Sequence, residues 1–173
     1  IAYFEAQANF ETSLYISNTS DTYKKQLTDS IFYSNGFNLS WSPGGDKIVF
    51  LNRKDNLQVT KICIIDTSGN NYEVLTTGYS PEWSPNGSKI SFTGAGTTGG
   101  NDLFLMNPDG TQITNISNSE NVIENNEKWS RDGSKLLFSQ QYQNSTALSY
   151  FIYNMNTNTA EFLVDSVYGC LWK

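Results

Sequence analysis

The sequence predicts an all-β protein: a β-propeller of four repeats, each about 43 residues long and forming one four-stranded blade. One motif occurs three times, as W-S-P-G-G-D-K-I-V-F from Trp41, W-S-P-N-G-S-K-I-S-F from Trp83 and W-S-R-D-G-S-K-L-L-F from Trp129. A fourth tryptophan, Trp172, stands where the next copy would begin, which gives spacings of 42, 46 and 43 residues. A period of this size, built from short strand-like segments, is typical of propeller blades.

Each motif predicts two strands joined by a tight turn. The S-P-x-G centre favours a turn because proline presets φ and glycine accepts a positive φ. The strand before the turn ends at the tryptophan, and the next one ends nine residues later at Phe50, Phe92 or Phe138. We align Phe4, which ends the segment I-A-Y-F, with these phenylalanines. The chain would then begin at the second strand of a blade.

The rest of each repeat predicts a third and a fourth strand. The third strand ends at an Asp or Asn, and an apolar residue of the fourth strand follows nine positions later, after hairpin sequences such as P-D-G. These pairs are Asn18 and Leu27, Asp66 and Leu75, Asn107 and Ile116, and Asn154 and Leu163. Alternation gives the third strand two apolar faces. Cys63 occupies a position that is aromatic in the other three repeats, so we expect this thiol to pack in the core.

The repeats cover the whole chain, which starts and ends at adjacent positions within a repeat, and this predicts one propeller domain. Its blade units are residues 37–77, 79–117 and 125–164, and a blade that combines residues 1–28 with 168–173. Propellers usually close their ring by splitting a blade between the two ends of the chain. The same phase fits a closed ring of four blades, a part of a larger propeller, or a homodimer with eight blades.

The motif residues are predicted to shape turns and fill space between blades. They are Trp41, Pro43, Gly45, Phe50, Trp83, Pro85, Gly87, Phe92, Trp129, Gly133, Phe138 and Trp172.

Composition excludes several classes of function. The net charge of −6 and pI near 4.5 argue against a nucleic-acid partner, which needs clustered basic residues. Histidine is absent, so the usual general base and the commonest transition-metal ligand are missing. The candidate acid–base groups Glu82, Glu120 and Glu127 show no paired spacing, and the D-x-x-G and N-P-D-G hairpins lack the full calcium-loop pattern. We therefore expect no enzyme activity, cofactor or metal, and we expect no transmembrane segment because the sequence has no apolar run of 18 residues.

Candidate binding residues lie just before each motif tryptophan. In a propeller, the loop that enters the innermost strand opens at one rim of the central channel, and repetition would gather these positions in a ring. Four residues before the tryptophans stand Phe37, Tyr79, Asn125 and Tyr168, and one residue before two of them stand Glu82 and Lys128. Three aromatic groups and an amide would suit a protein or peptide partner.

The W-S-P-x-G-x-K-I-x-F core, the L-F-L-M-N-P-D-G-T hairpin and the L-T-like ending resemble the TolB-type WD-like propeller repeat, most clearly over residues 79–117. The resemblance covers nearly the whole chain, although Arg131 replaces the motif proline in one repeat. It implies a non-enzymatic scaffold that binds proteins and is periplasmic or secreted. The same repeats resemble propellers that gate prolyl-oligopeptidase-like and tricorn-like peptidases, which leaves a gating role as an alternative. A carbohydrate-binding propeller is a further alternative.

Overall fold

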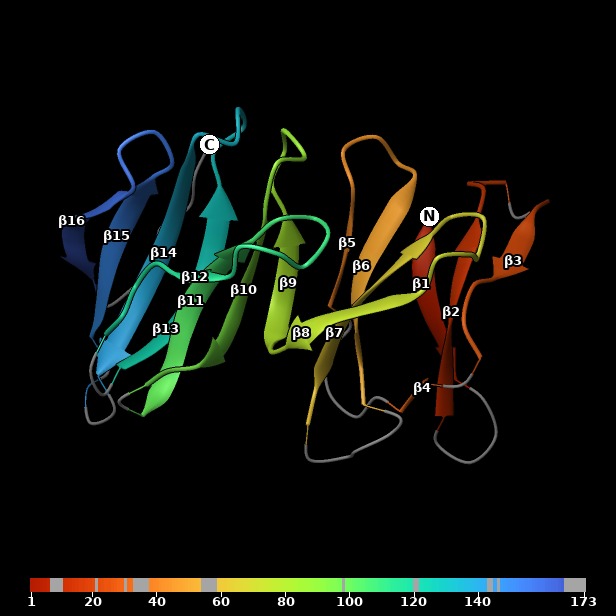
Figure 1. The fold of residues 1–173 in the computed structure, drawn as a ribbon, viewed down its shortest axis with the longest axis horizontal. Helices are drawn as coiled ribbons and strands as arrows, with labels where there is room; N and C mark the ends of the chain where they lie inside the picture. The colour runs from red at the N-terminus through yellow and green to blue at the C-terminus, as the bar shows by residue number, and fades with distance from the viewer. Residues whose placement is uncertain are drawn as a thin grey trace. The chain divides into compact units, whose positions relative to one another are not determined.

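The computed structural model describes residues 1–6, 11–20, 22–29, 31–32, 38–53, 59–97, 99–119, 122–142, 145 and 147–166. Every regular element in these ranges is a β-strand (Figure 1). The chain divides into two compact units, residues 1–83 and residues 84–173. The boundary falls inside the third repeat, directly after the motif Trp83.

The first unit contains two antiparallel four-stranded sheets. One has the order β1 (Ala2–Ala6), β2 (Glu11–Ser17) and β3 (Lys24–Gln26), and β4 (Ile31–Phe32) also pairs with β2. The other has the order β5 (Leu39–Trp41), β6 (Lys47–Asn52), β7 (Lys61–Asp66) and β8 (Glu73–Thr77). β9 (Tyr79–Trp83) ends the unit and packs against β5 and β6. Residues 38–77 thus form the predicted four-stranded blade.

The second unit is one continuous sheet. It contains β10 (Ile90–Ala95), β11 (Gly100–Met106), β12 (Thr114–Asn115), β13 (Val122–Trp129), β14 (Lys135–Tyr142), β15 (Leu148–Asn154) and β16 (Thr159–Ser166). Its order is β16-β15-β14-β13-β11-β10, and β12 pairs with β11. Neighbours within a repeat are antiparallel, whereas β11 and β13 belong to different repeats and pair in parallel.

The turn after each motif tryptophan has the same hydrogen bonds in all three copies. The backbone N–H of Ser84 donates to the carbonyl of Lys89 over 2.9 Å, and the N–H of Gly87 donates to the carbonyl of Ser84 over 2.9 Å. The Ser84 hydroxyl accepts from the N–H of Lys89 over 2.9 Å. The turns that start at Ser42 and Ser130 repeat all three bonds. The serine of the motif therefore completes the turn that proline and glycine permit.

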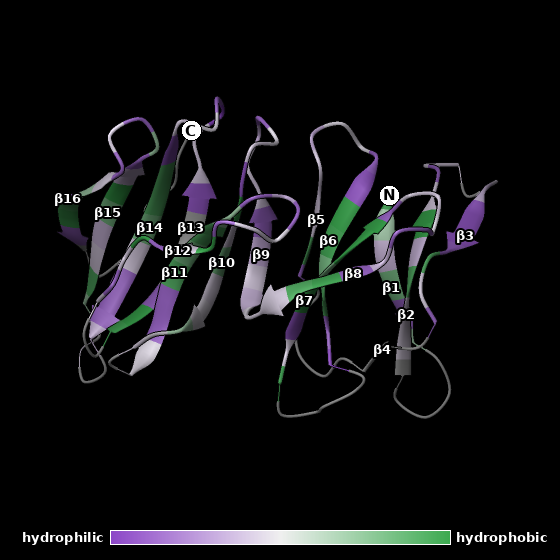
Figure 2. Ribbon diagram, viewed as in Figure 1, coloured by the Kyte–Doolittle hydropathy of each residue, from purple (hydrophilic) through white to green (hydrophobic). Residues whose placement is uncertain are grey.

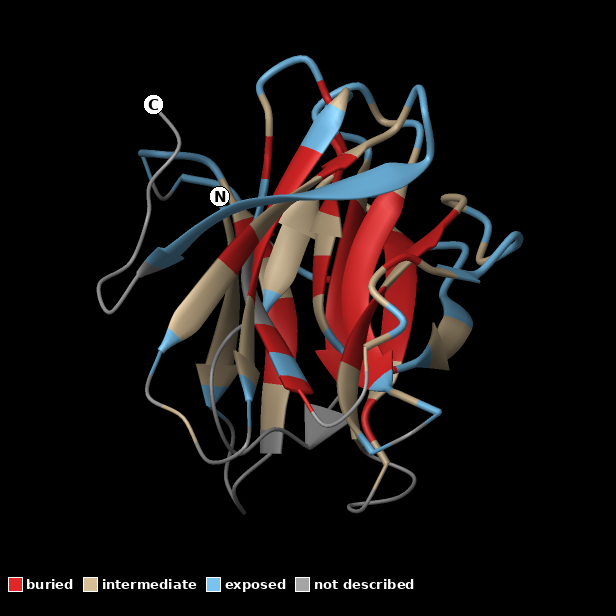
Figure 3. Ribbon diagram, turned by 90° about the vertical axis from the view of Figure 1, so that its left-hand side faces the viewer, coloured by how far each residue is buried: buried red, intermediate tan, exposed pale blue. Residues whose placement is uncertain are grey.

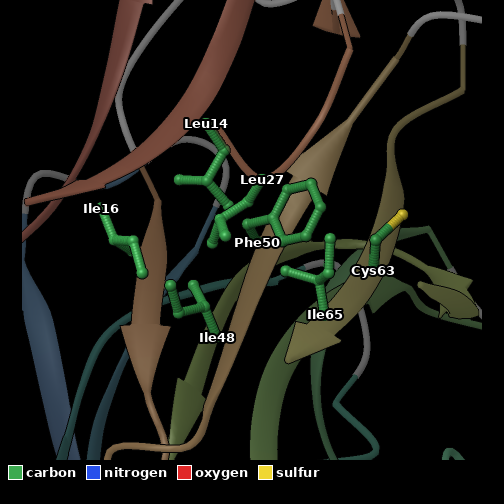
Figure 4. Close-up of a cluster of buried hydrophobic side chains, with 7 residues drawn as sticks. All are labelled: Leu14, Ile16, Leu27, Ile48, Phe50, Cys63 and Ile65. Carbon is green, nitrogen blue, oxygen red and sulfur yellow. The ribbon is translucent and has the colours of Figure 1, made fainter. Parts of the chain in front are cut away.

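The core of the first unit lies between its two sheets. Figure 4 shows its seven buried side chains, which gather between strands of the two sheets. Leu14, Ile16 and Leu27 come from the first repeat, and Ile48, Phe50, Cys63 and Ile65 come from the second. One face of one blade thus packs on the opposite face of the next, which explains why both faces of a third strand are apolar.

The second unit repeats this packing with equivalent residues. Leu103, Leu105 and Ile116 of the third repeat pack with Trp129, Leu136, Phe138 and Tyr153 of the fourth. Burial of one such large side chain contributes roughly 1.5–3 kcal/mol. In Figure 3 the outermost strand of this unit, β16, crosses the front in pale blue because residues 159–165 are exposed. In Figure 2 most turns are hydrophilic and the central part of β6 is strongly hydrophobic, whereas β3, β9 and β13 are more hydrophilic.

An aromatic pair joins the second and third strands of most repeats. Phe92 stacks on Phe104 with ring centroids 5.3 Å apart, and Phe138 stacks on Phe151 at 5.5 Å. In the first repeat the stacked pair is Tyr3 and Tyr15 at 5.9 Å.

The alignment of Phe4 with the motif phenylalanines is therefore wrong by one residue. Tyr3 lies opposite Tyr15 in the strand register, as Phe92 lies opposite Phe104, whereas Phe4 lies opposite Leu14. The spacing of the motif could not reveal this shift, because the residues 1–4 used for the alignment include neither the motif tryptophan nor its turn.

Cys63 is buried, as predicted from its position in the repeat. Its sulfur lies 3.1 Å from the hydroxyl of Tyr72, and the ring of Tyr72 lies 6.2 Å from that of Phe50. The side chain of Tyr72 thus contributes the aromatic contact that the third strand lacks in this repeat. The Cys63 thiol acts in packing.

Gly100 marks the closest approach between β11 and β13. Its φ is +98°, and a β carbon at this position would lie 2.2 Å from the carbonyl oxygen of Val122. Only glycine fits such a backbone conformation so close to another strand.

We expect Gly100→Ala to lower the free energy of unfolding by about 2 kcal/mol or more, because it combines backbone strain with a steric clash. Urea denaturation measures this change. Gly44→Ala is the control, since Gly44 lacks a positive φ and its nearest neighbour is the Asp46 carboxylate at 3.2 Å. Equal effects of the two substitutions would contradict the proposed role of Gly100.

Candidate functional site

The structure describes only part of the predicted rim. Tyr79 and Glu82 lie on β9 of the first unit, and Lys128 lies on β13 of the second. Phe37, Tyr168 and Trp172 lie outside the described residues, and of Asn125 only the backbone in β13 is described. The predicted ring and the latch at the ends of the chain therefore remain predictions.

Tyr79 is presented on a firmly anchored segment. Its side chain is 44% exposed. Just before it, the N–H of Gly78 donates to the carbonyl of Thr60 over 3.0 Å. Just after it, Ser80 has a φ of +50°, its hydroxyl bonds the amide of Asn38 over 3.3 Å, and Pro81 is buried. A large, exposed aromatic side chain on a fixed backbone loses little conformational entropy when it binds a partner.

Ser40, one residue before Trp41, has a structural contact. Its hydroxyl accepts from the backbone N–H of Trp83 over 3.0 Å, which ties β5 to β9. The contact gives the Ser40 hydroxyl a structural role.

A groove of about 370 Å³ lies in the second unit beside the turns of the third and fourth repeats. Its apolar part is formed by Leu105, Ile116, Met155 and the ring of Tyr153. Its polar part is formed by Asn86, Ser88, Lys89, Thr114, Ser134, Asn156 and Asn158, together with Gly133. This volume is within the usual range for small-ligand sites, roughly 300–1,000 Å³.

Hydrogen bonds hold much of the groove in place. The Lys89 ammonium donates to Asn107 Oδ1 over 2.7 Å, and the hydroxyl of Tyr153 lies 3.4 Å from Asn158 Oδ1. Asn86 lies against Gly133, where a β carbon would come within 2.6 Å of the amide nitrogen. The Lys89 ammonium in the wall is bonded to Asn107, and the other polar groups are amides and hydroxyls, which both donate and accept, so these walls suit a neutral polar ligand. Sequence reasoning missed the groove because its lining residues come from turns of different repeats.

The hairpins considered for calcium use their side chains within the turn. Asp66 Oδ2 accepts from the amide of Asn71 over 2.6 Å. Asp109 Oδ1 accepts from the N–H and hydroxyl of Thr111 over 3.0 and 2.6 Å, and these bonds lower the pKa of Asp109. Within the described ranges, no three His, Cys, Asp or Glu side chains come together as a metal site.

Of the acid–base candidates, only the side chain of Glu82 is described, and it is half-buried on β9. Glu120 lies outside the described residues, and the side chain of Glu127 is not described. The described part of the chain contains no helix long and apolar enough to span a membrane.

No protein-family model and no curated protein sequence matches the chain. Solved structures match it by fold. TolB from Acinetobacter baumannii aligns with a TM-score of 0.72 and 19% identity, over 94% of this chain and 40% of that one. A prolyl endopeptidase aligns with a TM-score of 0.71 and 15% identity, over 95% of this chain and 28% of that one. An oligogalacturonate lyase in complex with manganese aligns with a TM-score of 0.67 and 15% identity, over 95% of this chain and 50% of that one.

These likenesses establish the fold and no more, because the identities are low. The all-β elements and the propeller neighbours confirm the predicted β-propeller fold and its similarity to TolB and peptidase propellers. The chain spans about half the length of the lyase and less of the other two structures.

Asp132 lies in the motif turn next to the groove residues Gly133 and Ser134. The hydroxyl of Ser130 and the N–H and hydroxyl of Ser134 donate to its carboxylate and lower its pKa from 3.8 to about 2. Hydrogen bonds to the charged form favour that form.

We expect Asp132 to titrate near pH 2 and Ser130→Ala to raise its pKa toward 3.8, as measured by carboxyl ¹³C NMR. Since the folded pKa is depressed, the stabilising contribution of Asp132 is complete above pH 3.8 and is lost as the pH falls through about 2. Thr157→Ala, in another hairpin, should leave this titration unchanged. An unshifted titration in Ser130→Ala would show that the Ser130 hydroxyl is not responsible.

Proposed function

We propose that this chain is a non-enzymatic interaction module that binds a protein or peptide through the segment beginning at Tyr79. The observation that supports this proposal is the exposed Tyr79 ring between the anchored Gly78 and Pro81. Exposed tyrosines on rigid backbone are frequent anchors of protein interfaces. The likeness to TolB supports a role of this kind, in the periplasm or in secretion.

The proposed site includes the other rim positions. Phe37, Asn125 and Tyr168 stand at the same place in their repeats, four residues before the motif tryptophan, and Glu82 and Lys128 stand one residue before it. A partner that engages several repeats would contact these residues as a set. If two chains paired into a larger propeller, each chain would contribute its own copy of these rim residues to the binding surface.

We expect Tyr79→Ala to weaken a peptide selected by display on the native protein by at least tenfold, or about 1.4 kcal/mol, because truncation removes the aromatic anchor. Calorimetry on the selected peptide measures the dissociation constant. Tyr142→Ala is the matched control, since Tyr142 is 59% exposed on β14. Both variants should keep the native melting temperature.

Unchanged affinity in Tyr79→Ala would exclude this segment as the site. Tyr168→Ala tests the set independently. If both aromatic residues act in one surface, each substitution weakens the same peptide.

A second candidate function is carbohydrate binding at the groove of the second unit. It is favoured by the amide and hydroxyl walls beside the ring of Tyr153, and by the likeness to an oligogalacturonate lyase. Neutral polar side chains can donate to and accept from sugar hydroxyls.

If this function is correct, a glycan array should identify a bound oligosaccharide, and Asn156→Ala should weaken it about fivefold, equivalent to the loss of about one hydrogen bond. Asn70→Ala, an exposed asparagine of the first unit, is the control. An array without any bound glycan would remove this candidate.

The likeness to a prolyl endopeptidase supports a third role, in which the propeller gates access to a hydrolase domain. The flanking gene sequence discriminates this role from the others. A G-x-S-x-G segment with a downstream Asp and His would favour the gating role.

A further inference from the structure

Two buried acidic residues face each other in the second unit. β11 and β13 pair through Gly100 with Val122 and Asn101 with Ile123, so the next position along both strands brings Asp102 beside Glu124. Each of these two side chains is only 1% exposed. Like charges in such positions repel, and a buried environment strengthens the repulsion because its dielectric constant is low.

Neutral groups surround the pair. The amide of Asn115 donates to Asp102 Oδ2 over 2.6 Å, and the amide of Gln140 donates to Glu124 Oε1 over 3.1 Å. The hydroxyls of Ser117 and Ser119 also bond the Glu124 carboxyl. The second oxygens, Asp102 Oδ1 and Glu124 Oε2, have no hydrogen-bond partner among the described residues.

The loop before β11 closes over Asp102. A β carbon on Gly96 would lie 2.8 Å from the Asp102 carboxyl group, and the N–H of Gly96 donates to the carbonyl of Gly100 over 3.2 Å. Asp102 is thus packed from the loop as well as from β12 and β13. A buried carboxylate oxygen without a hydrogen-bond partner carries a desolvation cost. Adding a proton to the carboxylate would remove this cost.

The first repeat shows that the fold does not require an acid at this place. Ser13 precedes Leu14 as Asp102 precedes Leu103, and the amide of Gln26 donates to the Ser13 hydroxyl over 3.3 Å. The same hydrogen bond is therefore made with a neutral oxygen. The two carboxyl groups need a physical explanation beyond blade formation.

Burial raises the pKa of Glu124 above its ordinary value. The negative charge of Asp102 raises it further, whereas the hydroxyls of Ser119 and Ser117 and the amide of Gln140 act in the opposite direction. Asp102 lies on β11, Ser117 and Ser119 follow β12, and Gln140 lies on β14. Of these groups, which all affect the pKa of Glu124, only Asp102 is charged.

We propose that Asp102 and Glu124 hold one proton between them, and that this shared proton fastens β11 to β13 and makes the junction of the third and fourth repeats sensitive to pH. A proton on Glu124 Oε2 can donate to Asp102 Oδ1, so one proton gives both unpartnered oxygens a hydrogen bond and removes one of the two charges. When the proton leaves to solvent, two buried carboxylates face each other and the strand pair weakens. This device is independent of the partner proposed for Tyr79.

The direction of the pH dependence follows from the raised pKa. The folded protein keeps a proton that the unfolded chain has already lost above about pH 4.5, the ordinary value for Glu. The junction is therefore most stable below that pH and loses stability as the pH rises toward the folded pKa of the pair. In this window the unfolding equilibrium constant rises by up to tenfold per pH unit, because one proton is released.

Carboxyl ¹³C NMR of the native protein tests the proposal directly. We expect the Glu124 resonance to titrate above its ordinary value of 4.5, because burial raises its pKa. A Glu124 titration at or below its ordinary value of 4.5 would overturn the proposal. This measurement does not depend on whether any variant folds.

Glu124→Gln provides the second test. Its amide can donate to Asp102 Oδ1, so this variant should be at least as stable as the native protein at pH 8. The hydrogen-exchange protection factors of β11 and β13, which are corrected for the intrinsic exchange rate, should no longer depend on pH. Glu161→Gln, on the exposed strand β16, is the control and should keep the native dependence. A native dependence in Glu124→Gln would overturn the proposal.

A bound cation is the competing explanation for two facing carboxylates. If 1 mM CaCl₂ or MgCl₂ raised the melting temperature of the native protein at pH 8 but not that of Glu124→Gln, the pair would hold a metal and the shared proton would be excluded. We expect no difference between these two proteins on adding either salt.

Discussion

The turn after each motif tryptophan fixes the strand register on which the rest of each repeat depends. Its serine hydroxyl accepts a backbone N–H that the turn would otherwise leave without a partner, as Ser84 does for Lys89. This bond, together with two backbone bonds, places Trp41 opposite Ile48 and Trp129 opposite Leu136. A shift of one residue would move every apolar side chain to the other face of its strand. The turn is thus the local cause of a core that forms between distant segments.

A fixed register makes consecutive blades complementary. Leu14 of the first repeat and Leu103 of the third occupy equivalent places, and each packs on the second strand of the repeat that follows. The first repeat buries apolar residues against the second, and the third does so against the fourth, so these repeats do not bury their apolar residues alone. Where a repeat lacks the aromatic residue of its third strand, another residue of that repeat supplies the contact, as Tyr72 does beside Cys63. Stability is therefore a property of pairs of repeats.

The period, the turns and the ends of the third strands could be predicted from the sequence because each depends on residues close together in the chain. The alignment of Phe4 failed because it rested on four residues without a motif tryptophan to set the spacing, and only the pairing of Phe4 with Leu14 identifies Tyr3 as the equivalent residue. The groove and the acidic pair could not be predicted. The groove joins turns of different repeats, and Asp102 meets Glu124 through the parallel pairing of strands from two repeats.

Function in such a chain is most reasonably sought where repeats differ. Equivalent positions that are alike, such as Phe92 and Phe138, are explained by packing, since each stacks on an aromatic ring in the neighbouring strand. The pair of Asp102 and Glu124 is not explained in this way, because the first repeat has the neutral Ser13 at the place of Asp102 and keeps the same amide contact. A buried acid that the blade does not need costs free energy unless another interaction offsets that cost. Tyr79 is a candidate for a different reason: its position is aromatic in three repeats, yet its ring is exposed, so packing in the core does not explain it.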